Sequence, residues 1–256
     1  MGKTSGIFER TEIKYLITAG QRGAFMERAG GHLLADEFGR STVLSVYFDT
    51  PDWRVIRASI ERPFYKEKLR LRSYGTPSAD SAVFLELKKK CGGTVYKRRE
   101  SMTLAQAKAY LSGGEMPKDT QIMREIDYCF RSRPLLRPAA VICSEREAMY
   151  DRDDRQVRVT FDDSLRFRTD GIALEKGSAG SPLLPPDTSV MEIKVLSAMP
   201  LWLSGALSEL QIYPSSFSKY GTAYQIIMRR ESKCSTQSFS QSLQTASPSA
   251  AISSAR

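Results

Sequence analysis

Charged residues occupy every second position in five segments of this chain that otherwise have the composition of β-strands. The segments are Arg10-x-Glu12-x-Lys14, Lys68-x-Arg70-x-Arg72, Glu86-x-Lys88-x-Lys90, Lys97-x-Arg99 and Glu192-x-Lys194. Successive side chains of a strand point to opposite faces, so each charged set shares one face and the intervening Leu and Ile residues share the other. An ordinary solvent face mixes Thr, Ser, Gln and both signs of charge. Here Lys and Arg dominate, which favours a cationic face that holds a polyanion together with a divalent metal.

The overall charge agrees with this interpretation. Among 256 residues, 38 are Lys or Arg and 29 are Asp or Glu, which leaves a net charge of +9. Nucleic acid, an anionic membrane and a phosphorylated ligand are the natural partners of such a chain, and net charge alone does not choose among them. The length is sufficient for one large domain with a sizeable core.

Cysteine spacing and hydropathy restrict the class of protein. The chain has no C-x-x-C pair, so it predicts neither a disulfide framework nor a zinc site, and reduced thiols are expected. No apolar run approaches the ~20 residues of a membrane span, and residues 1–8 lack the apolar core of a signal peptide. We therefore predict a cytoplasmic protein. The four cysteines are Cys91, Cys129, Cys143 and Cys234.

Periodicity and turn residues predict an α+β fold of eight or nine strands with helices between groups of strands. Antiparallel neighbours are expected, because most connections within a group are too short for a parallel crossover. The pattern predicts a helix over 19–38, interrupted near Gly30-Gly31, a strand over 41–49, and separate strands over 156–162 and 165–170. Thr103 is the predicted N-cap of a helix over 104–111. The sequence from 231 to 256 contains nine serines and almost no large apolar residues, which predicts a disordered tail after a domain of residues 1–230.

A sheet of about eight strands can close into a barrel whose interior holds one extended ligand. If the alternating bases point inward, the interior is a cationic tunnel in which phosphate oxygens pair with Arg and Lys. We expect such a closed antiparallel barrel.

Two roles stay open for Glu12, Glu86 and Glu192. They are salt-bridge partners of the bases, or oxygen ligands of Mg²⁺ or Mn²⁺ that act together with substrate phosphates.

Eight ordered segments carry a resemblance to a known family. They are Glu12–Tyr15, Ser45–Thr50, Lys68–Arg72, Glu86–Lys88, Lys97–Arg99, Arg158–Asp162, Glu192–Lys194 and Ser218–Gly221. In order and spacing they resemble the VTC domain, the polyphosphate polymerase domain of the vacuolar transporter chaperone complex, in the CYTH-like superfamily of triphosphate tunnel metalloenzymes. No single one of these short motifs is specific. The resemblance covers about residues 8–229.

The resemblance implies a tunnel of antiparallel strands with helices packed outside, which transfers the γ-phosphoryl group of ATP to a growing inorganic polyphosphate. A divalent metal, Mn²⁺ or Mg²⁺, is the implied cofactor, and a membrane protein is an implied partner. The implied catalytic bases are Lys14, Arg70, Arg72, Lys88, Arg146, Arg158 and Lys219. Lys97 is an implied substrate-binding base, and the alternating rows add Lys68, Arg99 and Lys194. Glu192 is the implied metal ligand, with Glu12 and Glu86 as further candidates.

Two departures from the family pattern bear on these assignments. In the family segment that matches Arg146, an aromatic residue commonly precedes the base, whereas this chain has Ser144. The wider superfamily, which contains adenylate cyclases and thiamine triphosphatases, typically opens with Glu-x-Glu-x-Lys, whereas this chain has Arg10-x-Glu12-x-Lys14. Loss of the first carboxylate removes one metal ligand and adds a base, which favours binding of a long polyanion over two-metal hydrolysis.

Two alternative functions stay open at this point. One is a triphosphatase of the same fold that hydrolyses inorganic triphosphate or a nucleoside triphosphate. The other is a non-catalytic module that binds polyphosphate, inositol phosphates or nucleic acid. Nucleic acid is the least expected partner, because base stacking needs aromatics among the bases, and Tyr47 and Phe48 lie in a strand without neighbouring bases. The sequence has no P-loop or dinucleotide fingerprint, so ATP would have to bind the basic tunnel.

Overall fold

The computed structural model describes residues 11–61, 63–92, 94–196 and 198–244. Within these residues the protein is α+β, as the sequence predicts. The strands are β1 (Thr11–Thr18), β2 (Leu33–Asp49), β3 (Tyr65–Tyr74), β4 (Ala82–Cys91), β5 (Thr94–Thr103), β6 (Arg137–Asp151), β7 (Arg158–Arg168), β8 (Ser181–Pro182) and β9 (Thr188–Val195). The helices are α1 (Ala19–Ala29), α2 (Arg54–Ile60), α3 (Leu104–Leu111), α4 (Gln121–Arg131), α5 (Leu201–Glu209) and α6 (Lys219–Gln244), with short 3-10 turns η1 (Gly30–His32) and η2 (Leu174–Lys176).

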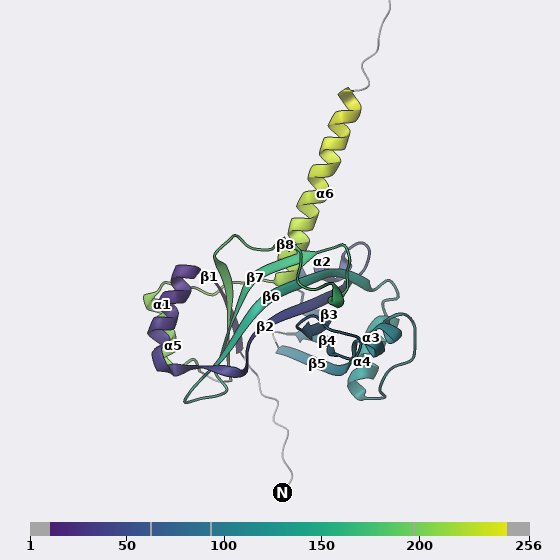
Figure 1. Cartoon of the computed structure of the whole chain (residues 1–256). Coiled ribbons are helices and arrows are strands. Elements are labelled where there is room, and N and C mark those ends of the chain that lie inside the picture. The colour runs from purple at the N-terminus through teal and green to yellow at the C-terminus, as the bar shows by residue number, and fades with distance from the viewer. Residues whose placement is uncertain (1–10, 62, 93, 197, 245–256) are drawn as a thin grey trace, which may run out of the picture.

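The strands form one open sheet (Figure 1). Its order is β1-β9-β7-β6-β2-β3-β4-β5, and β8 pairs with β7. Every pair of neighbours is antiparallel, as expected from the short connections. β1 and β5 are the two edges, and no ladder joins them within the described residues. The prediction of a closed barrel is therefore wrong.

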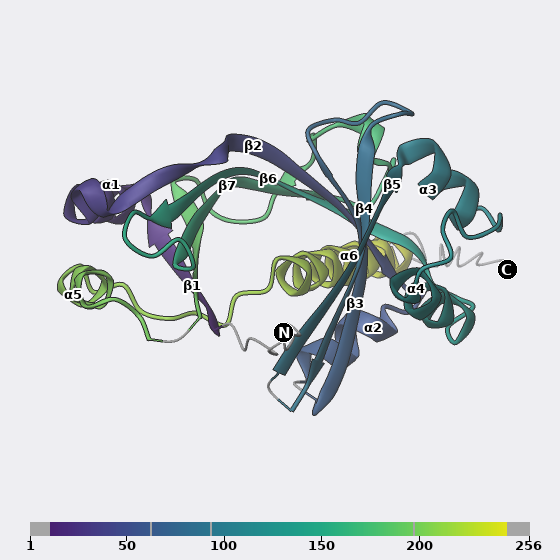
Figure 2. The same cartoon turned by 90° about the horizontal axis from the view of Figure 1, so that it is seen from below.

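Side chains, and not backbone hydrogen bonds, bridge the gap between the two ends of the sheet. Lys88 Nζ on β4 lies 3.6 Å from Glu12 Oε1 on β1, although β9, β7, β6, β2 and β3 stand between these strands in the sheet order. The contact is made because the sheet curves strongly, as Figure 2 shows. β5 also carries a run of charge over 97–100, which opposes pairing of an edge strand with a further strand. The number of strands and the alternation of charge do not specify how strongly the sheet curves.

One face of the sheet is apolar, and the other carries the bases together with a smaller apolar cluster under α2 and α6. On the apolar face, Leu85 and Leu87 of β4 share a buried cluster with Met123 of α4, and α3 contributes to the same cluster. A second cluster lies under α1 and α5, where Phe161 of β7 meets Phe25 edge-to-face with ring centroids 6.0 Å apart. The basic face is the opposite face, which carries the alternating Lys and Arg residues. Helices cover the apolar face at both ends, so the basic face lies on the inside of the curve.

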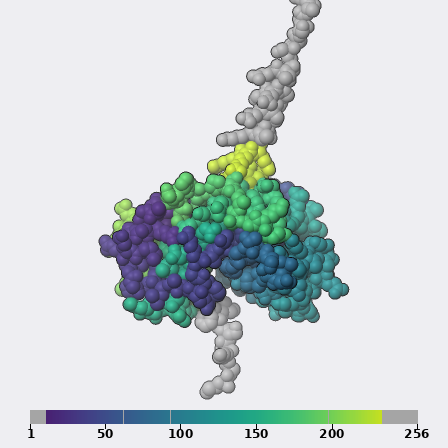
Figure 3. Space-filling model, in the orientation of Figure 1, coloured from purple at the N-terminus to yellow at the C-terminus, as the bar shows by residue number. Residues whose placement is uncertain are grey.

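Helix α6 begins on the basic face and then leaves the body of the protein (Figures 1 and 3). The ring of Tyr220 stacks on Tyr47 of β2 with centroids 4.6 Å apart. Its hydroxyl donates to Asp49 Oδ2 at 2.9 Å, and the same carboxylate accepts the backbone N–H groups of Val55 and Ile56 at the start of α2. Asp49, the last residue of β2, therefore forms hydrogen bonds with both α2 and α6. No helix of the described residues is long and apolar enough to cross a membrane.

Two predicted element boundaries are wrong. Residues 33–38 belong to strand β2 and not to a helix, because the chain leaves the helical conformation at Gly30, where φ is 47°. The predicted strands over 156–162 and 165–170 are one strand, β7, with a residue of φ 47° at Ser164. The register of β7 with β6 shifts at this point, so the chain passes the irregular residue without ending the strand.

The N-cap prediction for α3 is confirmed. Thr103 accepts a hydrogen bond from the backbone N–H of Gln106, and the Gln106 side chain accepts one from the backbone N–H of Thr103. At the C-terminus, α6 extends to Gln244, where the sequence predicts a disordered tail from residue 231 on. Residues 1–10 and 245–256 lie outside the described residues, and the domain boundary at residue 230 stays a prediction.

Replacement of Leu87 by Ala should lower the free energy of unfolding by about 2–5 kcal/mol, because Leu87 is completely buried in the apolar cluster under α3 and α4. Urea denaturation followed by circular dichroism measures the change. As a control, Leu201→Ala at a strongly exposed position of α5 should change it by less than about 0.5 kcal/mol. Equal effects of the two substitutions would contradict the assignment of the apolar core.

Candidate functional site

The sheet register brings the predicted bases and carboxylates to one face. Lys14 of β1 stands opposite Glu192 of β9, and Arg158 of β7 stands opposite Lys194. Across the other half, Tyr47 is opposite Arg70, Arg70 is opposite Glu86, and Glu86 is opposite Arg99. The residues of this face that the sequence predicts are Glu12, Lys14, Lys68, Arg70, Arg72, Glu86, Lys88, Lys97, Arg99, Arg146, Arg158, Glu192 and Lys194. Lys219 joins them from the first turn of α6.

Glu86 is the centre of one charge cluster. Its Oε2 accepts from Arg70 Nε at 2.7 Å, and its Oε1 accepts from Arg99 Nε at 2.6 Å and lies 2.8 Å from Lys97 Nζ. Only 1% of the Glu86 side chain is exposed. Burial alone would raise its pKa, but the charges of Arg70, Arg72 and Lys97 outweigh burial and hold the pKa far below the usual value. Both oxygens are engaged with bases, which favours the salt-bridge role over the metal-ligand role.

Asp162 of β7 is the centre of a second cluster, which the sequence interpretation missed. Its two oxygens accept from Arg146 Nε at 2.9 Å and Nη2 at 2.6 Å, and it also binds Lys219 Nζ and the Ser144 hydroxyl. The side chain is fully buried, yet the charges of Lys219 and Arg146 outweigh burial and hold its pKa well below the usual value. Asp162 ends the Arg158–Asp162 motif two positions after Thr160, so alternation would have placed it on this face.

The third cluster joins the two ends of the sheet. Glu192 Oε1 lies 2.9 Å from Lys194 Nζ, and Glu12 Oε1 lies 3.4 Å from Lys14 Nζ and 3.6 Å from Lys88 Nζ. Burial would raise the pKa of Glu192, but Lys194, Lys14 and Arg146 hold it well below the usual value. Glu192 is therefore ionised, and both carboxylates lie near Lys88 of β4, across the space between β1 and β4.

Arg158 lies at the margin of the site. Its Nη2 is 2.6 Å from Asp36 Oδ2 of β2, and 43% of its side chain is exposed. Arg70, Arg72, Arg146 and Lys219 are more enclosed, whereas Lys97 is equally exposed. Burial also changes the pKa of two lysines of the face. It lowers the pKa of Lys68 to about 8, and it also lowers the pKa of Lys219 to about 8 against the opposing effect of Asp162.

The statement that Tyr47 lacks neighbouring bases is wrong. The Tyr47 hydroxyl accepts a hydrogen bond from Arg70 Nη1 at 3.1 Å, because Arg70 stands directly opposite it on β3. Arg72 also reaches β2, where its Nε donates to Ser45 Oγ at 3.2 Å. One side of the Tyr47 ring is covered by Tyr220, so this aromatic is not presented for base stacking. The error arose because strand pairing, and not sequence proximity, decides which bases neighbour Tyr47.

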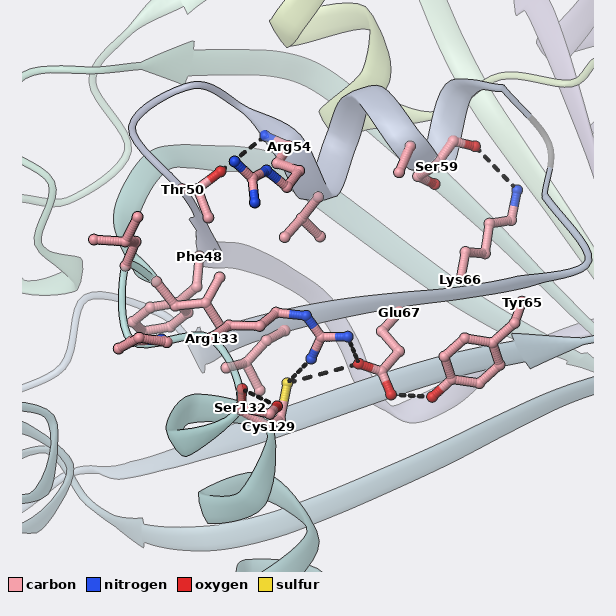
Figure 4. A pocket seen from close by; sticks show the side chains of 16 residues that line it. Phe48, Thr50, Arg54, Ser59, Tyr65, Lys66, Glu67, Cys129, Ser132 and Arg133 are labelled. Atoms are coloured by element: carbon pink, nitrogen blue, oxygen red, sulfur yellow. Dashed lines mark hydrogen bonds and ion pairs between the residues drawn. The ribbon is translucent and has the colours of Figure 1, made fainter.

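A cavity of about 430 Å³ lies elsewhere, among α2, β3 and the segment that follows α4 (Figure 4). Its walls include Phe48 and Leu69, which belong to the apolar cluster under α3 and α4. Glu67 accepts from Arg133 at 2.8 Å and also from the Tyr65 hydroxyl, so the polar groups at one side pair with one another. None of the predicted site residues lines this cavity. The described cavity and the basic face are separate features of the protein.

The pattern of strands and bases matches a known family. The profile of the VTC domain family matches residues 9–228. The chain belongs to the VTC domain family. No curated protein sequence matches this chain. The match covers every motif described above, and the resemblance stated from the motifs is therefore confirmed.

Several solved structures are similar to this VTC domain. A candidate adenylate cyclase from Bacillus halodurans has 13% sequence identity and a TM-score of 0.50, with 81% of this chain and 92% of that chain covered. A candidate adenylyl cyclase from Hippeastrum, with a dominant triphosphatase activity, has 16% identity and a TM-score of 0.47, with 83% and 93% covered. A third, from Vibrio parahaemolyticus, has 9% identity and a TM-score of 0.45, with 84% and 98% covered. The similarity to the Bacillus halodurans structure shows a shared fold and nothing about activity.

Replacement of Asp162 by Asn should destabilise the domain by about 3–5 kcal/mol, because Arg146 and Lys219 would remain enclosed without their counter-charge. Inorganic tripolyphosphate should recover much of the loss, since phosphate oxygens pair with both bases and ligand binding stabilises the folded state. Thermal unfolding with and without tripolyphosphate measures both effects. Asp153→Asn on an exposed turn is the control and should have almost no effect. An Asp162→Asn protein of unchanged stability would show that this carboxylate does not hold the cluster.

The affinity for tripolyphosphate should fall as the pH rises from 7 to 9. Lys68 and Lys219, each with a pKa of about 8, are mostly charged at pH 7 and mostly neutral at pH 9, and the phosphate prefers the charged form. Calorimetric titration at constant ionic strength measures the slope. In the double variant Lys68→Arg with Lys219→Arg the fall should be weaker, because a guanidinium stays charged over this range. The comparison also removes the ligand's own titration, and equal slopes in the two proteins would refute the assignment.

Proposed function

We propose that the basic face binds inorganic polyphosphate and that this domain transfers the γ-phosphoryl group of ATP to the end of the bound chain. The observation that carries the proposal is the convergence of bases from β1, β3, β4, β6 and α6 on one side of a curved sheet. Lys14, Arg70 and Arg146 come from strands far apart in the sequence, and α6 adds Lys219. The membership of the VTC domain family supports the same conclusion.

The charge balance of the face supports a ligand with several negative charges. Glu86 and Asp162 each pair with two or more bases, so the bases outnumber their counter-charges. Phosphate oxygens complement Arg forks bidentately and Lys as a point charge. A linear chain of phosphates presents repeated charge along its length, which suits rows of bases two residues apart on neighbouring strands.

The donor set suits a metal ion that is held only partly by the protein. No group of three or more His, Cys, Asp and Glu residues in the described part of the chain could hold a metal by itself. Mg²⁺ is typically held by one or two carboxylates together with substrate phosphates. Glu192 and Glu12, which share the space between β1 and β4, would provide the carboxylates. When bound, such an ion would neutralise charge on the β- and γ-phosphoryl oxygens.

The protein side chains then supply position and charge. Phosphoryl transfer requires in-line placement of the attacking and leaving oxygens and neutralisation of the equatorial oxygens, and no protein nucleophile is needed. Arg70 and Arg72 are fixed by Glu86, Tyr47 and Ser45, so their N–H groups are oriented before a phosphate arrives. Such preorganisation lowers the cost of charge stabilisation in the transition state.

A gel of reaction products tests the proposal. Purified protein incubated with ATP and Mn²⁺ should produce chains of polyphosphate, and Glu192→Gln should lower the rate by about 10²–10³-fold, because it removes a carboxylate charge at the reacting centre. Glu175→Gln, whose carboxylate pairs with Lys108 outside the site, is the matched control and should retain activity.

Each other outcome of this experiment identifies a different function. Release of orthophosphate alone would overturn the polymerase assignment in favour of a triphosphatase. Binding of tripolyphosphate without turnover of ATP would identify a binding module. Full activity in Glu192→Gln would exclude that residue from metal binding.

A further inference from the structure

Tyr47 lies on the basic face, where the proposed reaction uses it only to orient Arg70 and assigns it no contact with phosphate. Its side chain is 7% exposed, and its hydroxyl accepts the hydrogen bond from Arg70 Nη1 at 3.1 Å. The flat side of the ring stacks on Tyr220 at 4.6 Å with planes 17° apart, which holds the ring in place. The hydroxyl is therefore presented to the same cationic space as Arg70.

The groups that face Tyr47 from the neighbouring elements are almost all cationic or apolar. From β3 they are Lys68, Arg70 and Arg72. From β6 the partners are the apolar Ala140 and Ile142, and from α2 it is the apolar Ile56, all of which share its buried cluster. From α6 it is Tyr220, whose hydroxyl donates away from Tyr47 to Asp49. The nearest carboxylate of the face is Glu86 of β4, which lies on the far side of Arg70 and pairs with it.

We propose that Tyr47 is a further phosphate-binding residue whose proton is linked to anion binding: the hydroxyl is ionised when the basic face holds no anion and is protonated when a phosphate chain is bound. As a phenolate, Tyr47 neutralises part of the charge of Arg70 and its neighbours. As a phenol, it donates its O–H to a phosphate oxygen. The proton that it takes up comes from the solvent, so no other reactant is required.

The electrostatics of the cluster support this assignment. Burial by itself raises the pKa of Tyr47, but the charges of Arg70, Arg72 and Lys68, together with the Arg70 hydrogen bond, outweigh burial and lower the pKa to about 7. A bound polyanion cancels those positive charges, so the pKa returns toward the ordinary value of a phenol. Phosphate binding then takes up protons at any pH between the two values.

This inference rests on the proposed binding of a phosphate chain to the basic face, and it needs a readout that reports Tyr47 alone. Lys68 and Lys219 also gain protons in the same range of pH, so total proton uptake is not specific. The ultraviolet absorbance of tyrosinate is specific to tyrosine. Burial raises the pKa of Tyr15 and Tyr220, whereas that of Tyr74 is also lowered by nearby arginines. Tyr74 is therefore the control position.

The experiment compares the wild-type domain with Tyr47→Phe and Tyr74→Phe at pH 8. The wild-type protein should show most of one tyrosinate, and a saturating amount of inorganic tripolyphosphate should abolish that signal. Tyr47→Phe retains the ring that stacks on Tyr220, so it should fold, and it should lack the signal from the start. Tyr74→Phe should behave as the wild type. Circular dichroism checks the fold, and calorimetry at the same pH checks tripolyphosphate binding.

The outcomes separate this inference from the proposed function. Tripolyphosphate binding without loss of tyrosinate would overturn the proton linkage while leaving phosphate binding intact. A wild-type protein without tyrosinate at pH 8, or a signal that disappears in Tyr74→Phe and persists in Tyr47→Phe, would overturn the assignment to Tyr47. Failure of the wild-type protein to bind tripolyphosphate would overturn the proposed function and the linkage together. If Tyr47→Phe did not fold, the wild-type and Tyr74→Phe proteins would still test the proton linkage. Loss of tyrosinate from both on adding tripolyphosphate would support it, and a signal that persists in the wild type would overturn it.

Discussion

The neutralisation of enclosed positive charge is the constraint on which the rest of this structure depends. Bases from several strands face one another across a curved sheet, and burial of unpaired charge is expensive. Glu86 and Asp162 relieve this cost, and each is buried and ionised because more than one base surrounds it. Their removal would leave Arg70 or Arg146 without a counter-charge. The carboxylates that hold the site together are therefore different from those that face the gap, Glu12 and Glu192.

The remainder of the fold places this charged surface on the inside of the curve. The Leu and Ile residues between the charged positions form two apolar clusters, and α1, α3, α4 and α5 cover them. On the other side of the sheet, α2 and the first turns of α6 pack around Tyr47 in a third apolar cluster, and Lys219 of α6 binds Asp162. The N-terminal end of a helix carries partial positive charge, so α6 adds to the attraction for anions at this face.

The alternation of charge predicted the basic face because the two-residue period of a strand assigns a face without knowledge of the partner strand. The same reasoning could not predict Leu33 and Leu34 as part of β2, since an apolar pair after a glycine pair suits a helix and a strand equally. Ser164 led to the second wrong boundary for another reason. The pair Asp163-Ser164 has the residue types of a turn, but the pairing of β7 with β6 continues beyond it. The energy of that pairing depends on residues of β6, which are not part of the local sequence around Ser164.

By itself, the sequence determined the composition of the site and the face on which each strand residue lies, because both depend only on residue type and backbone period. The resemblance of its ordered motifs also identified the VTC domain family. Only the tertiary structure decided that the sheet is open, that Tyr47 meets Arg70, and that Asp162 pairs with Arg146 and Lys219. These features depend on which strands pair, in which register, and on how far the sheet curves before Glu12 meets Lys88. Contacts between residues far apart in the chain set that geometry, and no local pattern records them.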